Sequence, residues 1–245
     1  LEARQVVEIR NSPGAAGTVA NNLGALGVGR ILALGAIGVD GQGFDLKVAL
    51  HRARVNTDHL FESPDLFTPT YTKPILTGTA RELERVDIKN RSVTQPGLEQ
   101  RIIQTLTGLI GQVDGVMVMD QVQERNCGVV TDGVRQALQV TAAANPDTIF
   151  FADSRSRIGE FRDVIVKANR DEAASAVRPG QPTDLDIDAL APKARSLVQR
   201  NGRPVLITLG PDGILCADDR AVHHVPGIHV PEPIDIVGAG DGVSA

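Results

Sequence analysis

The sequence has few aromatic residues and no surplus of positive charge. Of its 245 residues 3% are aromatic, with one Tyr and no Trp, and the formal net charge is −5. Proteins that bind nucleic acid usually carry a basic surplus and aromatic side chains that stack on bases. We therefore expect no nucleic-acid partner. The core must be built mainly from Val, Ile, Leu and Ala, as in parallel sheets covered by helices.

Cysteine is scarce, and long apolar runs are missing. Cys127 and Cys216 lie far apart without C-x-x-C spacing, which is typical of free thiols in a reducing compartment. No apolar run approaches the roughly 20 residues that a membrane span needs. The opening residues contain no apolar signal core, so export is not indicated. These absences predict a cytoplasmic protein with no membrane partner.

Several common catalytic motifs are also missing. Without G-x-x-x-x-G-K-[ST], a P-loop kinase is excluded, and without H-E-x-x-H or G-x-S-x-G, zincin and nucleophile-elbow hydrolase functions are disfavoured. His223, His224 and His229 have no partner at metal-ligand spacing. Surface or strand-packing roles are therefore favoured for these histidines.

Short apolar strands alternate with amphipathic helices, which indicates β-α-β units and a mainly parallel sheet. The predicted strands are residues 31–35, 113–119, 148–152, 164–166 and 205–209. The predicted helices are residues 16–26, 43–53, 98–110, 129–143 and 185–200. Residues 214–217 and 221–225, separated by Asp-Asp-Arg, predict a hairpin. We expect one α/β domain over residues 1–245, because this length suits one large domain.

Two polar-rich segments interrupt this alternation. Polar and apolar residues alternate in 4–10 and 66–90, as in strands with one wet face. We expect these strands to pair into a small β lid that projects from the main body. Exposed strand edges need covering, so the lid could also join two copies into a homodimer. The chain opens and stops abruptly, and we expect sequence to be missing at both ends.

The segment richest in candidate chemistry is residues 235–245, D-I-V-G-A-G-D-G-V-S-A. Its glycines let the backbone approach a ligand closely, and free N–H groups at a helix start favour an anion. A carboxylate at Asp241 could accept a proton from a hydroxyl held beside that anion. On spacing alone, an equal alternative is a glycine turn whose Asp only caps the helix.

Residues 235–241 resemble the D-T-x-G-A-G-D signature of the PfkB, or ribokinase-like, family of carbohydrate kinases, with Ile236 in place of Thr. The resemblance implies that Asp241 is the general base and that three backbone amides form an anion hole for the transferring phosphoryl group. Those amides would belong to Gly238, Ala239 and Gly240. It also implies a monovalent cation such as K⁺ near Asp235 and the backbone of Val237.

Residues 13–27, P-G-A-A-G-T-V-A-N-N-L-G-A-L-G, resemble the sugar-binding element of this family, P-G-G-A-A-N-V-A-x-x-L-A-x-L-G. Gly14 matches the first glycine, whereas Ala15 stands at the second and Thr18 at the usual Asn. That Asn normally hydrogen-bonds the sugar, so Thr18 changes a contact that the family element makes with its acceptor. Without the family, the same segment is an amphipathic helix behind a Pro-Gly turn.

Two further segments follow in family order. Asn169 and Glu172 form the N-x-x-E element, which in the family lies near the ATP phosphates and the water shell of Mg²⁺. By physics alone the same pair would be a capping box. The run from Thr208 to Gly213 resembles the nucleotide-contacting T-x-G-x-x-G element, with Gly210 between them, and is equally an ordinary strand-to-hairpin turn. Residues 35–43 resemble a third family turn, in which we favour helix capping for Asp40.

The order of these segments predicts a ribokinase-like fold and an ATP-dependent kinase that phosphorylates a sugar or sugar phosphate. Residues 82–91 and the run at Asp153, Arg155 and Arg157 resemble the heptose-phosphate kinase branch. These arginines could meet a sugar phosphate or form a salt-bridged loop, and both interpretations stay open. So do two other functions: a catalytically inactive sugar- or nucleotide-binding regulator, and a nucleoside or vitamin kinase of the same superfamily.

Overall fold

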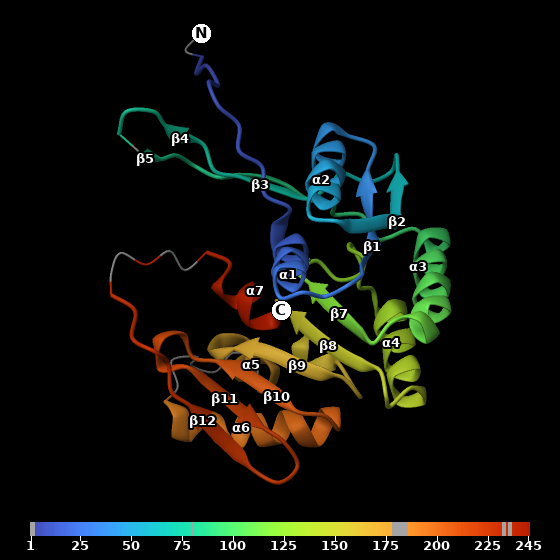
Figure 1. The fold of residues 1–245 in the computed structure, drawn as a ribbon, viewed down its shortest axis with the longest axis vertical. Helices are drawn as coiled ribbons and strands as arrows, with labels where there is room; N and C mark the ends of the chain where they lie inside the picture. The colour runs from blue at the N-terminus through green and yellow to red at the C-terminus, as the bar shows by residue number, and fades with distance from the viewer. Residues whose placement is uncertain (1–2, 80, 178–185, 232–233, 235–236) are drawn as a thin grey trace. The chain divides into compact units, whose positions relative to one another are not determined.

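The computed structural model describes residues 3–79, 81–177, 186–231, 234 and 237–245. These residues form an α/β structure (Figure 1). The contacts divide the chain into two compact units, Leu1–Asn90 with Ala245 and Arg91–Ser244, and each is described by itself. Within the described residues, no helix combines the length and the apolar character that crossing a membrane requires.

The N-terminal unit contains two β-strands that run parallel and two helices. They follow one another along the chain as α1 (Gly14–Ala25), β1 (Ile31–Gly38), α2 (Gly41–Arg52) and β2 (Val55–Ser63). The predicted strand and both predicted helices of this part are therefore present, whereas β2 was not among the predicted elements. A small apolar core joins these elements through Ala20, Leu50 and Val55.

Asp40 caps α2, as we expected from the sequence. Its Oδ1 accepts a hydrogen bond from the Gly43 N–H at 2.7 Å, which satisfies a donor left free at the helix start. The same carboxylate accepts bonds from the N–H and hydroxyl of Thr68, at 2.8 and 2.7 Å. Burial raises the pKa of Asp40, but the hydrogen bonds from Thr68 and Gly43 outweigh it and hold the pKa below its ordinary value.

The predicted strands within residues 66–90 form two short antiparallel pairs (Figure 1). β3 (Thr70–Thr72) pairs with β6 (Val86–Ile88), and β4 (Ile75–Leu76) pairs with β5 (Arg81–Glu82). The ring of Tyr71 on β3 lies under two cations, with Arg85 and Lys89 at 5.1 and 5.7 Å from its centroid.

The prediction of a further lid strand at residues 4–10 is wrong. Residues 3–13 form no strand, and Val6, Val7 and Ile9 are each 76% exposed. An extended segment becomes a strand only where a neighbouring strand pairs with its N–H and C=O groups. The alternation of polar and apolar residues is present in this segment, but the pairing that alternation presupposes is not.

The C-terminal unit is built on a six-stranded sheet in the order β12-β11-β10-β9-β8-β7. Four parallel strands occupy one side, and the predicted hairpin adds two antiparallel strands at the other edge. The strands are β7 (Gly115–Asp120), β8 (Ile149–Ser154), β9 (Ile165–Asn169), β10 (Val205–Thr208), β11 (Ile214–Ala217) and β12 (Val222–Val225). The expectation of a mainly parallel sheet flanked by helices is confirmed.

The helices of this unit follow local signals in the sequence. Pro96 occupies the first turn of α3, Thr131 caps α4, and α6 runs from its cap Asp186 to Gly202 in the left-handed conformation. The α-helices are α3 (Pro96–Leu109), α4 (Asp132–Ala144), α5 (Arg170–Val177), α6 (Ile187–Asn201) and α7 (Ala239–Ser244). Short 3₁₀ turns occupy Ile110–Gln112, Ile158–Glu160 and Gly210–Asp212.

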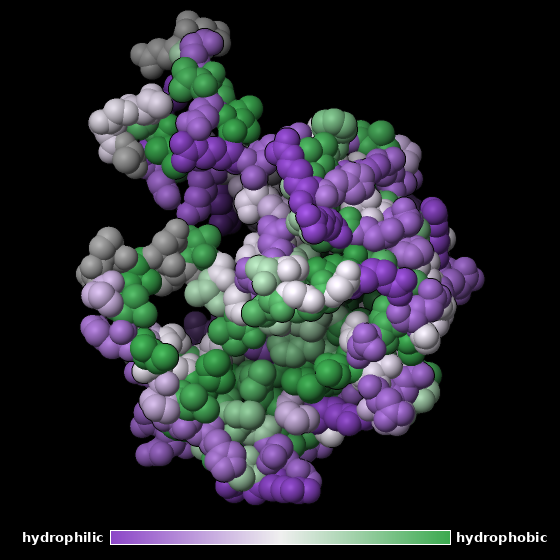
Figure 2. Space-filling model, viewed as in Figure 1, coloured by the Kyte–Doolittle hydropathy of each residue, from purple (hydrophilic) through white to green (hydrophobic). Residues whose placement is uncertain are grey.

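The two faces of the six-stranded sheet are buried to different depths. Side chains on one face are fully buried, namely Val166, Val205, Ile207 and Leu215. The alternating residues on the other face, Ile165, Leu206 and Cys216, are only half-buried. Figure 2 shows apolar side chains gathered over this sheet. Lys167, on the central strand β9, points to the same face as Leu206, its partner in the register. Unlike its neighbours on this face, Lys167 is buried.

Candidate active site

A buried ion pair lies near the carboxyl ends of β8 and β9. Nζ of Lys167 is 2.7 Å from Oδ2 of Asp153, and both side chains are 6% exposed. Parallel strands end at the same edge of a sheet, and in open α/β sheets that edge is where ligands bind. A buried charge is tolerated when it is paired, so each member of this pair requires the other.

The short helix α7 contacts this ion pair. The Ser244 hydroxyl donates a hydrogen bond to Oδ2 of Asp153 at 3.1 Å. A Cβ added at Gly240 would lie 3.2 Å from Nζ of Lys167, so the helix backbone approaches the ammonium group closely. Asp241 lies in the first turn of the same helix. The Gly238–Gly240 segment and Asp241 are therefore in the same cluster as the ion pair.

Asn169 and Glu172 form a reciprocal pair at the junction of β9 and α5. The Asn169 N–H donates to Oε2 of Glu172, and the Glu172 N–H donates to Oδ1 of Asn169, each at 2.8 Å. This geometry is a capping box, so that interpretation of the sequence is confirmed. The pair also borders a cleft of about 250 Å³, whose lining residues are Arg155, Ser156, Ile158, Asn169, Asp171, Glu172 and Ser175.

Two carboxylates of this cluster hold their protons more tightly than usual. Burial raises the pKa of Asp241, the charge of Asp153 raises it further, and Lys167 and Arg155 oppose the rise. Burial also raises the pKa of Glu172, where the bond from Asn169 opposes it. Carboxylates with shifted pKa values gather at catalytic sites, although structural ion pairs also shift them.

The end of β10 places the T-x-G-x-x-G segment next to this cluster. Thr208 stands opposite Asn169 in the sheet register, and its hydroxyl donates to the Ala168 carbonyl at 3.4 Å. Gly210 and Gly213 both adopt positive φ, at +64° and +96°. A Cβ at Gly213 would lie 2.1 Å from the Val225 carbonyl oxygen, so only glycine fits there.

Other predicted residues lie elsewhere in the chain or outside the described residues. Gly14, Ala15 and Thr18 belong to α1 of the N-terminal unit, and the Thr18 hydroxyl donates to the Gly14 carbonyl at 2.9 Å. Asp235 lies outside the described residues. Val237 precedes a turn in which Gly238 has a φ of +80°, and the Gly238 carbonyl accepts the Gly242 N–H at 2.9 Å.

The arginines after β8 have separate roles. Arg155 lines the cleft. Arg157 is buried instead, with Nη2 3.2 Å from Oδ1 of Asp120 and Nη1 donating to the Gln123 carbonyl at 2.9 Å. Arg157 is therefore part of the internal packing, and the sequence hypothesis that it contacts a sugar phosphate is wrong. Asp153 is likewise engaged by Lys167.

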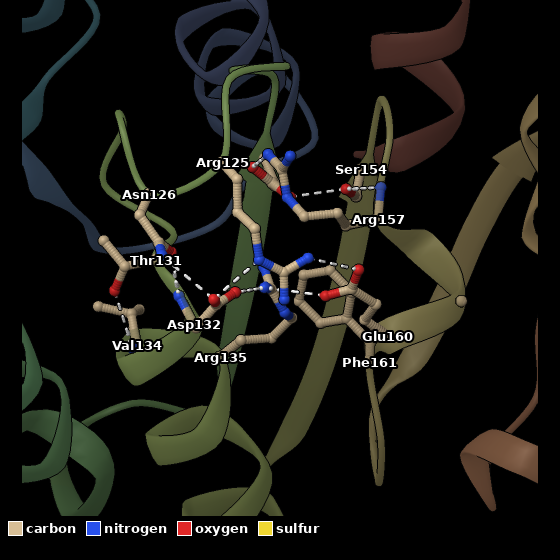
Figure 3. Close-up of polar contacts among 12 residues, drawn as sticks. Arg125, Asn126, Thr131, Asp132, Val134, Arg135, Ser154, Arg157, Glu160 and Phe161 are labelled. Carbon is tan, nitrogen blue, oxygen red and sulfur yellow. Dashed lines mark hydrogen bonds and ion pairs between the residues drawn. The ribbon is translucent and has the colours of Figure 1, made fainter. Parts of the chain in front are cut away.

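Figure 3 shows how this packing continues into an ion-pair network at the start of α4. Arg125 lies 2.9 Å from Asp132 and 3.1 Å from Glu160, while the buried Arg135 reaches Asp132 and, at 3.0 Å, Glu160. The guanidinium of Arg135 also lies 5.7 Å from the centroid of the Phe161 ring. The network joins the segment before α4 and the start of α4 to Glu160, in the turn after β8.

Comparison with known proteins decides which family these elements represent. The family model described as "pfkB family carbohydrate kinase" matches residues 2–245. The chain belongs to the pfkB family of carbohydrate kinases.

Individual relatives agree with this membership. The bifunctional protein HldE of Trichlorobacter lovleyi is 30% identical over 248 residues, which cover 98% of this chain and 48% of that protein. This pfkB family member thus spans about half the length of the curated relatives it matches.

Solved structures place this pfkB family member in the ribokinase-like fold. Ribokinase from Giardia lamblia superposes with a TM-score of 0.68 at 15% identity, covering 94% of this chain and 69% of that one. Phosphofructokinase-2 from Escherichia coli in complex with fructose-6-phosphate gives a TM-score of 0.62 at 20% identity, covering 93% and 72%. The same enzyme in complex with potassium gives 0.66 at 19%, covering 93% and 71%.

Sequence reasoning missed two polar residues of the pfkB cluster. Lys167 interrupts an otherwise apolar strand, I-V-K-A-N, and such a residue must find a partner when it is buried. A charged residue inside an apolar strand could therefore have marked Lys167 as part of a buried polar cluster. Ser244 lies three residues after the end of the signature, and nothing in its spacing pointed to Asp153, a residue 91 positions away.

Proposed function

We propose that this pfkB family member transfers the γ-phosphoryl group of ATP to a hydroxyl of a sugar or sugar phosphate. Family membership supports the reaction class. The observation that carries the proposal to particular residues is the cluster in which Asp241 lies with the Asp153–Lys167 pair and Glu172. Phosphoryl transfer requires mainly alignment and charge stabilisation from a protein, and such a cluster can supply both.

Asp241 is the proposed general base. Its raised pKa brings its proton affinity closer to that of the hydroxyl it must deprotonate. The amides of residues 238–240 are proposed to bind the transferring phosphoryl group. Gly238 supports this role because its positive φ turns the chain sharply before α7. The Lys167 ammonium group, which is paired with Asp153, lies next to Gly240 of this segment.

The nucleotide is proposed to bind along the carboxyl ends of β9 and β10. Asn169, Thr208, Gly210 and Gly213 border this edge and are the proposed contacts. Glu172 fits a role toward Mg²⁺ through water, because it lines the cleft and uses Oε2 for the Asn169 N–H. Magnesium, when bound, would offset the negative charge of the phosphates. Asp235 and the Val237 backbone remain the proposed site for a monovalent cation such as K⁺.

The acceptor is proposed to be a sugar phosphate held by the N-terminal element, Gly14, Ala15 and Thr18. The fold neighbour phosphofructokinase-2, solved with fructose-6-phosphate, supports a sugar phosphate. The resemblance of residues 82–91 to the heptose-phosphate kinase branch supports a heptose phosphate in particular. Arg155 in the cleft wall is a candidate contact for an anionic substrate. A cytoplasmic homodimer joined through strands β3–β6 also remains our proposal.

ADP release tests the function directly. The purified chain would be incubated with ATP, Mg²⁺ and a panel of sugars, sugar phosphates and nucleosides, with Asp241→Asn as the matched control. We expect turnover with a sugar phosphate and its loss in the variant. Turnover with nucleosides alone would favour the nucleoside kinase alternative. If no acceptor gives more ADP than Asp241→Asn does, the kinase function is rejected and the regulator remains.

A further inference from the structure

One carboxylate oxygen joins three elements of the C-terminal unit. Oδ2 of Asp153, on β8, accepts a hydrogen bond from Nζ of Lys167 on β9 at 2.7 Å and another from the Ser244 hydroxyl on α7 at 3.1 Å. All three residues are buried. The Ser244 hydroxyl also lies 3.2 Å from the Gly240 carbonyl oxygen, one turn earlier in the same helix.

Ser244 lies in the same helix as the proposed base, because α7 comprises Ala239–Ser244. Ser244 and Asp241 are three residues apart, which places them on neighbouring positions of one helix face. A bond that fixes Ser244 therefore also fixes the rotation of the helix and the direction in which the Asp241 carboxylate points.

We propose that Asp153 is a positioning residue for the general base, acting through Ser244 to hold α7 against Lys167. This inference rests on the proposed function of Asp241. The charged groups that face Asp241 come from several elements: Asp153 on β8, Arg155 after it and Lys167 on β9. The same three groups act on Glu172 of α5, so a movement of α7 relative to β8 and β9 changes the alignment of the whole cluster.

Ser244→Ala is the decisive variant, because it removes the link and leaves every charge in place. We expect kcat to fall roughly ten- to a hundredfold, the range that a small misplacement of a catalytic group produces. KM for ATP and for the acceptor should change less than about twofold, since neither binding element is altered. Ser244→Thr keeps the hydroxyl and should restore most of kcat.

A second readout does not depend on turnover. The Asp241 carboxyl carbon can be titrated by NMR and assigned by its absence in Asp241→Asn. Burial is the main reason that its pKa is raised, so release of α7 into solvent should lower the pKa in Ser244→Ala. Thr107→Ala is the matched control, because Thr107 is also a helical hydroxyl bonded back to the preceding turn, at Ile103 and Gln104. It should change neither kcat nor this titration.

Asp153→Asn tests the same link from its other end. If Asp153 acts through Ser244, the double variant with Ser244→Ala should be no slower than Asp153→Asn alone. Multiplying effects would overturn the inference, as would a Ser244→Ala variant with unchanged kcat and unchanged Asp241 titration. An inactive wild type would reject the proposed function instead. In that case a shifted Asp241 titration in Ser244→Ala still supports the positioning role.

Discussion

The guanidinium of Arg157 meets the carboxylate of Asp120 in a buried ion pair, with 3.2 Å between Nη2 and Oδ1. Their side chains are 7% and 2% exposed. The Ser154 hydroxyl donates to the other Asp120 oxygen at 2.7 Å and accepts the Arg157 N–H at 3.0 Å. The end of β7 is thereby fixed to the turn after β8, the turn from which Arg155 enters the cleft.

Replacing Arg157 by Met should therefore destabilise the C-terminal unit strongly. The change leaves a buried carboxylate without its cation, which typically costs about 3–5 kcal/mol. Arg125→Ala is the matched control, since Arg125 also pairs with carboxylates but is 58% exposed, and exposed pairs contribute about 1 kcal/mol or less. Urea unfolding measures both free energies. Equal losses in the two variants would contradict the importance we assign to burial.

Glu172→Gln separates the two roles of the capping box. The amide oxygen of Gln can still accept the Asn169 N–H, so α5 should keep its start, with thermal stability close to the wild type. The negative charge is lost, and we expect a several-fold higher Mg²⁺ concentration for half-maximal ADP release. Glu172→Ala should lose both the cap, at a cost of about 1 kcal/mol, and the Mg²⁺ response. An unchanged Mg²⁺ titration in Glu172→Gln would remove Glu172 from the metal site.

Asp241→Asn should stabilise the fold at neutral pH while it abolishes turnover. The folded-state pKa of Asp241 is raised, so between the unfolded and folded pKa values the folded state binds more protons and stability falls as pH rises. The ionised form at neutral pH is therefore the disfavoured one, and Asn avoids this loss. The melting temperature of the variant should exceed that of the wild type at pH 7, and the gap should close below the unfolded pKa. A constant gap would contradict this origin.

Two glycines of one turn give a controlled test of backbone geometry. Gly210 and Gly213 both have positive φ, a backbone conformation that disfavours alanine at either position. At Gly210 an added Cβ meets nothing within 4 Å, whereas at Gly213 it would lie 2.1 Å from the Val225 carbonyl oxygen. Gly213→Ala should therefore cost clearly more in urea unfolding and should separate β12 from the turn. Equal costs would mean that strain alone matters.

Much of the fold could be predicted from the sequence because its signals are local. Alternating apolar strands and capped helices indicated four of the sheet strands and the hairpin, and Asp40 was identified as a cap. β2 was missed, and α5 was indicated only by the capping box at its start, for different reasons. β2, V-N-T-D-H-L-F-E-S, is polar at most positions, and its pairing with β1 supplies what its composition lacks. α5 has eight residues, too few for a clear helical period.

The candidate site was predictable only in part. Asp241, Asn169 and Glu172 carry signatures within a few residues, so the sequence could name them. The Ser244–Asp153 contact joins positions 91 residues apart, and no local pattern encodes it. The predicted strand at residues 4–10 was wrong for the opposite reason. Its local alternation is clear, but no strand among the described residues pairs with it. Pairing and burial depend on the whole fold, whereas caps and turns do not.

The junction of β9 and α5 also restricts how this protein can change in length. β9 ends at Asn169 and α5 begins at Arg170, so the strand passes into the helix without a loop residue between them. One inserted residue would move Glu172 out of reach of the Asn169 N–H and turn α5 by about 100°. Evolution and protein engineering alike can lengthen most surface connections, but this one admits substitutions only.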